Sequence, residues 1–414
     1  MLEDVYVDAA TLRRFRSCVL GSHVERFCAW LQERGYDGMT VRLKMSILGR
    51  FDGWVRESQI AVGDLDERRA LEFITSHRRE GWGYRGAEYT VVQFVGFLRR
   101  AGVVAACAQP RDDSPTGLLL GRFDTYLRDE RGLAPCTISS YRFVVRPFVA
   151  RYFADAADSP AAVRAGQVRS FLLDRTRGVP PRRAQTVASA MRSFLRFLFL
   201  RGETPIDLAH AIPTVRQGRG AAMPRHLALH EVERVLRACD LSSHTGRRDH
   251  AILLLCARLG LRAGEVLALE LDDVRWREGE IRVRGKGLLR DRLPLPRDVG
   301  EAIASYLRKD RRAAECRRLF LCTKAPQRGS SHVSSVSTIV HRAFVRAGLD
   351  PAPGGAHVLR HSLATAMIRR GASMTEIGEV LRHRSGATTE IYAKLDFSAL
   401  REVALPWPVA GGGR

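Results

Sequence analysis

The sequence predicts a mostly α-helical protein with one small antiparallel sheet in its C-terminal half. Apolar residues recur at three- and four-residue steps in many segments, which is the pattern of amphipathic helices. The helical pattern of the first 104 residues returns about 100 residues later, which indicates a duplicated bundle. Three short segments between residues 273 and 295 alternate apolar and polar positions instead, as antiparallel strands do.

Composition and charge bound the function. The chain has 414 residues, of which 45% are hydrophobic, so it is globular and long enough for two or three domains. Lys and Arg number 67 against 45 Asp and Glu, a net charge of +22 that favours a polyanion such as nucleic acid. A membrane surface is the competing partner, but no apolar run approaches a spanning length and no signal peptide is recognisable. We therefore expect a cytoplasmic protein without membrane association.

The eight cysteines form no C-x-x-C pair, and no paired histidine spacing accompanies them. We therefore expect buried or free thiols in a reducing compartment and no zinc site.

The N-terminal quarter reads as a four-helix bundle. Residues 1–20 are weakly patterned, and we expect a flexible or docking segment there. An extra helical domain is expected at residues 21–104. Its four helices are expected at His23–Gly35, from Thr40 onward, at Asp64–Ser76 and at Thr90–Arg100.

The same order of aromatic residues returns in residues 117–204. Phe123 corresponds to Phe27, and the offset grows from 96 at this pair to 100 at Phe97 and Phe197, as loop insertions would produce. We interpret this as duplication, although two unrelated four-helix segments can also look alike. Linkers are expected at residues 105–116 and 205–224. Six arginines of the second bundle are candidates for phosphate contacts, although each could equally lie on a solvated helix face: Arg142, Arg146, Arg182, Arg183, Arg192 and Arg196.

A third domain is expected at residues 225–404, followed by a tail at 405–414. Its helices are expected at His230–Leu236, Asp249–Leu259, Glu265–Leu269, Val299–Arg308, Ser334–Ala347 and, near the end, Phe397–Val403. Its strands are expected at Asp273–Trp276, Glu280–Arg284 and Arg292–Leu295.

The stretch from His357 to Tyr392 concentrates chemically active side chains. Apolar spacing predicts a helix over Val358–Arg370, with His357 at its N-terminal edge and Gly371 as a left-handed cap after it. Ser373 and Glu376 form a capping box that opens a second helix. A third helix is expected from about Thr388, so two short turns would return His383 and Tyr392 toward the first helix.

These residue types suit a phosphodiester. Its negative charge in the transition state requires fixed cationic donors, and arginine provides a two-pronged donor to phosphate. Histidine can donate a hydrogen bond or move a proton near neutral pH, and a tyrosine hydroxyl can attack phosphorus. Any one of these residues alone is more often structural, so the combination carries the argument.

The combination resembles the tyrosine recombinase (phage integrase) family. The resemblance rests on His357-x-x-Arg360, then His383, then Tyr392 nine positions later. It extends upstream to Arg262 in the segment Leu-Gly-Leu-Arg-Ala-Gly-Glu and to Lys286 in Arg-Gly-Lys-Gly, and it covers most of residues 225–404. One departure is Arg382, because the family commonly has glycine directly before this histidine.

The resemblance implies a DNA breaking-rejoining fold for residues 225–404 and a SAM-like core-binding domain for residues 117–204, with double-stranded DNA held between them. It implies that Tyr392 attacks DNA and forms a 3′-phosphotyrosine. Arg262, Arg360, His357 and His383 would hold the phosphate oxygens, His357 would also take the phenolic proton, and Lys286 would protonate the leaving oxygen. Glu265 is expected to be a structural partner of an arginine. No cluster of Asp and Glu suited to two-metal catalysis accompanies these residues, so we expect no metal and no cofactor. The resemblance further implies a tetramer on DNA formed by this chain or with related recombinases.

Two alternatives stay open. A type IB-like DNA topoisomerase uses similar residues but reseals the same strand. A non-catalytic helical DNA-binding protein, such as a degenerate recombinase acting as a regulator, would not need Tyr392 at all. The expected outcome of a recombinase is integration, excision, transposition or resolution, and the sequence does not choose among them.

Overall fold

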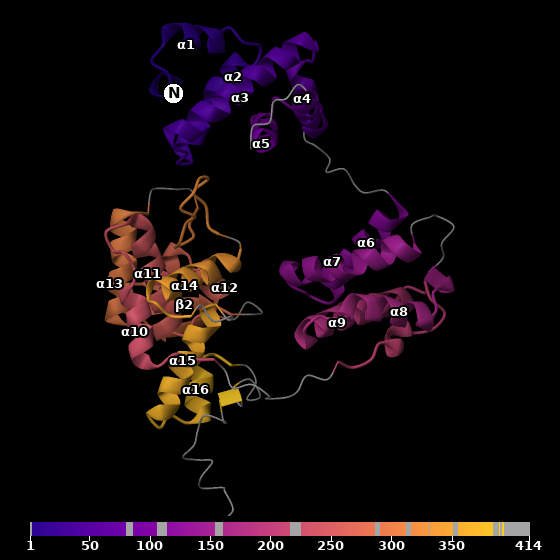
Figure 1. The fold of residues 1–414 in the computed structure, drawn as a ribbon, viewed down its shortest axis with the longest axis vertical. Coiled ribbons are helices and arrows are strands. Elements are labelled where there is room, and N and C mark those ends of the chain that lie inside the picture. Colours follow the sequence, from indigo (N-terminus) through magenta and orange to yellow (C-terminus); the bar gives the residue numbers. More distant parts are fainter. Residues whose placement is uncertain are drawn as a thin grey trace, which may run out of the picture. The chain divides into compact units, whose positions relative to one another are not determined.

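The chain folds into two compact units. A computed structural model describes residues 2–79, 86–105, 114–153, 160–215, 225–285, 290–311, 316–330, 332–350, 355–383, 389 and 391–392. One unit is residues 106–221, here the central unit. The other combines residues 1–105 with 222–414, and its two stretches are called the first bundle and the C-terminal part. Helices dominate both units (Figure 1), which confirms the predicted mostly α-helical class.

The first bundle contains five described α-helices: α1 (Ala9–Arg16), α2 (Gly21–Glu33), α3 (Gly38–Glu57), α4 (Glu67–Arg79) and α5 (Ala87–Arg100). Residues 1–20, expected to be a flexible or docking segment, contain helix α1 and pack into the bundle. Asp8 caps α1 by accepting hydrogen bonds from the amides of Ala10 and Thr11, and Leu2, Val5 and Phe15 are buried in the core of the bundle. Helix α4 begins later than predicted because Val62–Asp64 forms a 3-10 turn before it.

The central unit contains four α-helices in its described residues: α6 (Pro115–Thr125), α7 (Pro135–Tyr152), α8 (Ala165–Thr176) and α9 (Pro181–Leu200). Pro181 begins α9 at a position where its missing amide hydrogen costs nothing. The apolar faces of the helices meet in one core that includes Phe123, Phe148 and Phe194.

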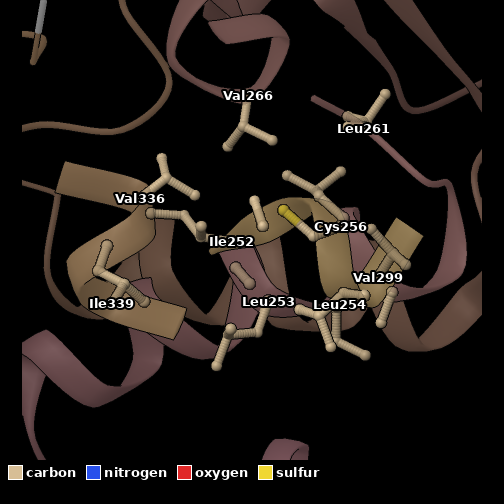
Figure 2. Packing of buried hydrophobic residues seen from close by; sticks show 14 of the residues in the cluster. Ile252, Leu253, Leu254, Cys256, Leu261, Val266, Val299, Val336 and Ile339 are labelled. Atoms are coloured by element: carbon tan, nitrogen blue, oxygen red, sulfur yellow. The ribbon is translucent and has the colours of Figure 1, made fainter. Parts of the chain in front are cut away.

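The C-terminal part is organised around α11 (His244–Arg258). Ser243 caps it by accepting a hydrogen bond from the Gly246 amide at 3.1 Å. Every residue from Ala251 to Ala257 is buried, as expected for a helix that is apolar on all sides. Helices α10 (Leu229–Arg237), α12 (Ala263–Ala268), α13 (Arg297–Lys309), α14 (Ser334–Arg346) and α15 (Ala356–Arg369) all pack on it. Figure 2 shows Ile252, Leu254 and Cys256 of α11 among side chains from these neighbours.

The predicted small antiparallel sheet is present. Its strands β1 (Val274–Arg275), β2 (Glu280–Arg284) and β3 (Arg290–Pro294) follow one another in order. Ile281 of β2 lies opposite Val274 and Leu293. Strand β1 is shorter than predicted because Asp273 belongs to a 3-10 turn, and β3 begins two residues earlier.

The two helices that position the site end and begin as predicted. Helix α15 ends at Arg369, and Gly371 follows with φ +84° and donates its amide hydrogen to the carbonyl of Ile368. Ser373 and Glu376 form the predicted capping box at the start of α16 (Met374–Val380). The helices expected from Thr388 and over Phe397–Val403 fall mostly or wholly outside the described residues.

Candidate active site

Five of the six predicted catalytic residues are described, and all five belong to the C-terminal part. His357 and Arg360 lie on α15, Arg262 precedes α12, and His383 follows α16. Tyr392 packs in a small core with residues of α15 and α16. Lys286 lies outside the described residues.

Arg360 ties three segments together. Its guanidinium is almost fully buried and donates from one terminal nitrogen to the carbonyl of Gly260 and from the other to the carbonyl of Leu381. Burial, with the nearby charges of Arg262 and Arg382, lowers the pKa of Arg360 to about 10. The side chain is therefore still a cation at neutral pH, held between the ends of α11 and α16.

Gly260 lets these segments approach. Its φ is +58°, a left-handed conformation, and a Cβ atom there would stand 2.8 Å from Cδ2 of Leu381. Glycine is therefore required twice, once for the backbone conformation and once for the close approach. The turn also sets the direction of the chain two residues before Arg262.

Arg262 is held by Glu265, as predicted. The Glu265 carboxylate accepts the Arg262 amide at 2.8 Å and its Nη1 at 2.7 Å. Burial by itself would raise the pKa of Glu265, but the hydrogen bond from the Arg262 amide and the charge of Arg382 together lower it. The carboxylate is therefore ionised at neutral pH. The Arg262 side chain is 38% exposed, so its guanidinium is fixed at one edge and accessible at another.

The hydroxyl of Tyr392 contacts an imidazole that the sequence did not single out. Nδ1 of His361 lies 2.6 Å from the phenolic oxygen. Burial raises the pKa of Tyr392 to about 12, although Arg360 and Arg262 act in the opposite direction. Burial, with His357 and Arg360, lowers the pKa of His361 to about 4. At neutral pH the phenol therefore keeps its proton and the imidazole is neutral and able to accept it.

His383 and His357 differ in their surroundings. Burial, with Arg360 and Arg262, lowers the pKa of His383 to about 4. Its Nδ1 is 2.8 Å from the Thr389 hydroxyl, so Nε2 is the nitrogen that would meet an anion. Its ring lies parallel to that of Tyr392, with centroids 6.4 Å apart. His357 is exposed one turn before His361 on α15, with ring centroids 6.3 Å apart.

Three residues at the site were missed or left open by the sequence. His361 directly follows Arg360 and lies four positions after His357, so helical spacing could have placed it on the same side of α15. Thr389 gave no signal. Arg382 stood out only as a departure from the family pattern, and its partner is Glu265, 117 positions away.

The arrangement is suited to phosphate chemistry. Two guanidiniums and a neutral imidazole surround one phenol whose hydroxyl already contacts a proton acceptor. A phosphodiester bound there would meet fixed positive charge at its non-bridging oxygens and a nucleophile beside it. Within the described ranges, no group of three or more His, Cys, Asp or Glu side chains could hold a metal ion. The same ranges contain no helix long and apolar enough to cross a membrane.

Comparisons with known proteins identify the family of this chain. Residues 225–399 match the family model described as phage integrase family, and residues 120–202 match that of the phage integrase N-terminal SAM-like domain. The integrase/recombinase y4rA of Sinorhizobium fredii is 40% identical over 92% of this chain and 93% of its own. Tyrosine recombinase XerD of Corynebacterium glutamicum is 30% identical over 67% of this chain and 94% of its own. The solved structure of XerH site-specific recombinase bound to difH, a post-cleavage complex, has a TM-score of 0.56 and 22% identity, covering 72% of this chain and 99% of that one.

Proposed function

The chain belongs to the phage integrase family, and we propose that it is a site-specific DNA recombinase whose nucleophile is Tyr392. It cuts and rejoins double-stranded DNA through a 3′-phosphotyrosine intermediate, and its role is the integration, excision or transposition of a mobile element. The contact between the Tyr392 hydroxyl and His361, beside Arg262 and Arg360, carries this proposal.

In the proposed cleavage step, the phenolic oxygen of Tyr392 bonds to phosphorus while the bond to the 5′ oxygen breaks. His361 takes the phenolic proton, in place of the His357 expected from the sequence. Lys286 gives a proton to the departing 5′ oxygen, which leaves a 5′-hydroxyl. The phosphotyrosine keeps the energy of the phosphodiester, so rejoining by another 5′-hydroxyl requires no external energy source.

In the same step, positive groups and hydrogen-bond donors stabilise the negative charge on the phosphate. Arg262 is the exposed guanidinium and contributes the direct two-pronged contact. Arg360 is committed to two backbone carbonyls and acts as a buried positive charge behind the site. His383 approaches through Nε2, and His357 stands exposed at the rim, where DNA would reach it.

We assign the grip on the DNA backbone to the central unit. Arg182, Arg183 and Arg196 are exposed there, on α9. Arg192 lies one turn before Arg196 and donates to the carbonyls of Ile212 and Pro213, at 3.4 Å each. Arg142 is already paired with Asp124, so it is the weakest of the six candidates.

Matched aromatic pairs support the proposal that the first bundle is a second copy of this domain. Phe27 and Phe94 meet edge to face with ring centroids 5.2 Å apart, and Phe123 and Phe194 do so at 5.1 Å. The match to XerD covers 94% of that protein but 67% of this chain, as expected if this chain carries an added domain.

Further pairs recur in the same two bundles. Phe51 and Phe73 meet at 5.1 Å in the first, as Phe148 and Phe171 do in the second. At the positions of Arg192 and Arg196, the first copy has Val92 and Gly96. At these two positions the first copy therefore lacks the charge that the second copy offers to DNA.

The proposed partners are double-stranded DNA and further subunits, of this chain or of related recombinases, in a tetramer. We place the protein in the cytoplasm, because recombination requires access to the DNA of the cell. The domain limits given above, 21–104, 117–204 and 225–404, belong to this proposal.

A nicked suicide substrate tests the nucleophile. Cleavage beside the nick releases a short fragment with a 5′-hydroxyl, and once this fragment diffuses away the covalent adduct cannot be reversed. The wild-type chain is expected to form a protein–DNA adduct that maps to Tyr392, and Tyr392→Phe is expected to bind DNA without forming it. If no adduct forms on DNA from the ends of the element, the remaining explanation is the alternative of a non-catalytic DNA-binding regulator. Relaxation of a plasmid that lacks any specific site, by monomeric protein, would favour the topoisomerase.

A further inference from the structure

Arg382 occupies a backbone position that disfavours a side chain. It directly follows the last turn of α16, where its amide donates to Glu379 and that of His383 donates to Gly378. These two hydrogen bonds form a Schellman motif, in which the left-handed residue is usually glycine. Arg382 adopts this conformation with φ +53°, and among the described residues Gln59 is the one other non-glycine residue with positive φ. The strain is kept here although the family commonly has glycine at this position.

The side chain of Arg382 is turned into the site. It is 7% exposed, and its Nη2 donates to Oε2 of Glu265 at 2.8 Å. Its Nη1 donates to the carbonyl of Val380 at 3.3 Å. Its Nε is buried without a hydrogen-bond partner and lies 3.8 Å from a carboxylate oxygen of Asp291 on β3.

The contact changes the charge balance around Arg262. With Glu265 alone, Arg262 would form a neutral pair, and the carboxylate would offset the charge that a phosphate needs. Arg382 shares the same carboxylate, which leaves one net positive charge on the group of three. Asp291 offsets little of this, because it is more distant and its side chain is 40% exposed and therefore screened by solvent.

We propose that Arg382 is a positioning residue that offsets the charge of Glu265 and so leaves the guanidinium of Arg262 available to the scissile phosphate. This inference rests on the proposed function. It explains why a strained backbone position carries a large buried side chain. Through its bond to Glu265, Arg382 also links His383, the next residue, to the segment that carries Arg262.

Substitutions of Arg382 separate the strain from the charge. Arg382→Gly is expected to change the melting temperature little, because the gain from a left-handed glycine opposes the loss of the contact with Glu265. The same variant is expected to cleave the suicide substrate about tenfold to hundredfold more slowly in a single turnover, as loss of an outer partner of a functional group does. Arg382→Lys restores the charge and is expected to recover part of the rate. Gln59→Gly relieves the same kind of strain outside the site and is expected to leave cleavage unchanged.

Neutralising Glu265 supplies the decisive comparison. If Arg382 acts by offsetting the Glu265 charge, adding Glu265→Gln to Arg382→Gly is expected to recover part of the lost rate. A merely structural role for Arg382 predicts that the double variant is slower than either single one. The inference is overturned if Arg382→Gly cleaves as fast as the wild type, or if Glu265→Gln deepens its defect. Failure of the wild-type chain to form any adduct would instead overturn the proposed function itself.

Discussion

The phenolic oxygen of Tyr392 lies 2.6 Å from Nδ1 of His361, in a site where the tyrosine side chain is fully buried. The proposed nucleophile and its proposed proton acceptor are therefore in contact without DNA. His361 contacts the tyrosine hydroxyl, while its neighbour Arg360 donates hydrogen bonds to two backbone carbonyls.

His361→Gln is expected to slow cleavage about a hundredfold or more, because the phenolic proton loses its acceptor. The rate of the variant should rise with pH, since the proton must then leave to solvent, whereas the wild-type rate should be flat between about pH 6 and 9. Single-turnover cleavage of the suicide substrate measures both. His341→Gln, at an exposed position on α14, is the matched control. A variant that keeps the wild-type rate and pH profile would remove His361 from the reaction.

The acid limb of the wild-type profile is expected at low pH. The pKa values of His361 and His383 are both lowered to about 4, chiefly by burial, so both imidazoles stay neutral down to about pH 5. Cleavage at subsaturating DNA, which reports the free enzyme, should fall only below that pH. Unfolded histidines titrate near pH 6.5, so the unfolded chain binds more protons between about pH 6.5 and 4, and stability should fall as the pH is lowered through this window. An acid limb centred near pH 6.5 would contradict the buried environment of these rings.

Gly260→Ala is expected to destabilise the C-terminal part by about 1–3 kcal/mol through its left-handed backbone, with a further cost from contact with Leu381. Gly279 has a similar φ of +63° with open space around it, so Gly279→Ala isolates the backbone cost. Denaturant unfolding of both variants gives the difference. Equal losses in the two variants would show that the approach of Leu381 to Gly260 is not tight.

Replacing Arg192 and Arg196 together by alanine is expected to weaken DNA binding and to reduce the slope of log affinity against log salt by about 2. Arg13→Ala with Arg14→Ala in α1 removes the same charge from the first bundle and should leave the slope unchanged. Binding titrations between about 50 and 200 mM salt measure the slopes. A similar loss of slope in both double variants would place the first bundle on DNA as well.

Replacing Lys44 by a neutral residue is expected to stabilise the first bundle. Lys44 is 5% exposed and is met by Gln93 at 2.8 Å, Thr90 at 3.3 Å and the rings of Tyr36 and Tyr89. Burial lowers the pKa of Lys44 to about 8. The unfolded chain therefore binds more protons between about pH 8 and 10.5, and local stability should rise with pH across that range.

Lys44→Met should accordingly raise the stability of the bundle at pH 7, by up to about 3 kcal/mol, and flatten its pH dependence. Hydrogen exchange of α3 and α5 amides in the full chain, at pH 7 and at higher pH, provides the measurement. Lower protection in the variant would mean that the lysine contributes more by its contacts than it costs by its burial.

Local sequence patterns predicted most of the fold. They did not predict the features that depend on contacts between segments far apart in the sequence. Ser373 with Glu376 and the left-handed Gly371 fixed the junction of α15 and α16, because these signals act within a few residues. Helix α1 was missed because Phe15 is its one buried residue, so its sequence shows no apolar stripe. The five predicted site residues that the structure describes come together. The group that contacts the Tyr392 hydroxyl depends on how the chain returns 31 residues later, which spacing alone does not specify.

Arg360 binds the carbonyls of Gly260 and Leu381, so a side chain with a proposed role in the reaction also holds the fold together. A variant that loses it should unfold more often and be cleared by proteases, whereas Tyr392→Phe should persist as an intact protein. Natural loss of activity at these two positions would therefore leave different traces in a cell: a missing protein in one case, and in the other a silent occupant that shields recombination sites from active relatives.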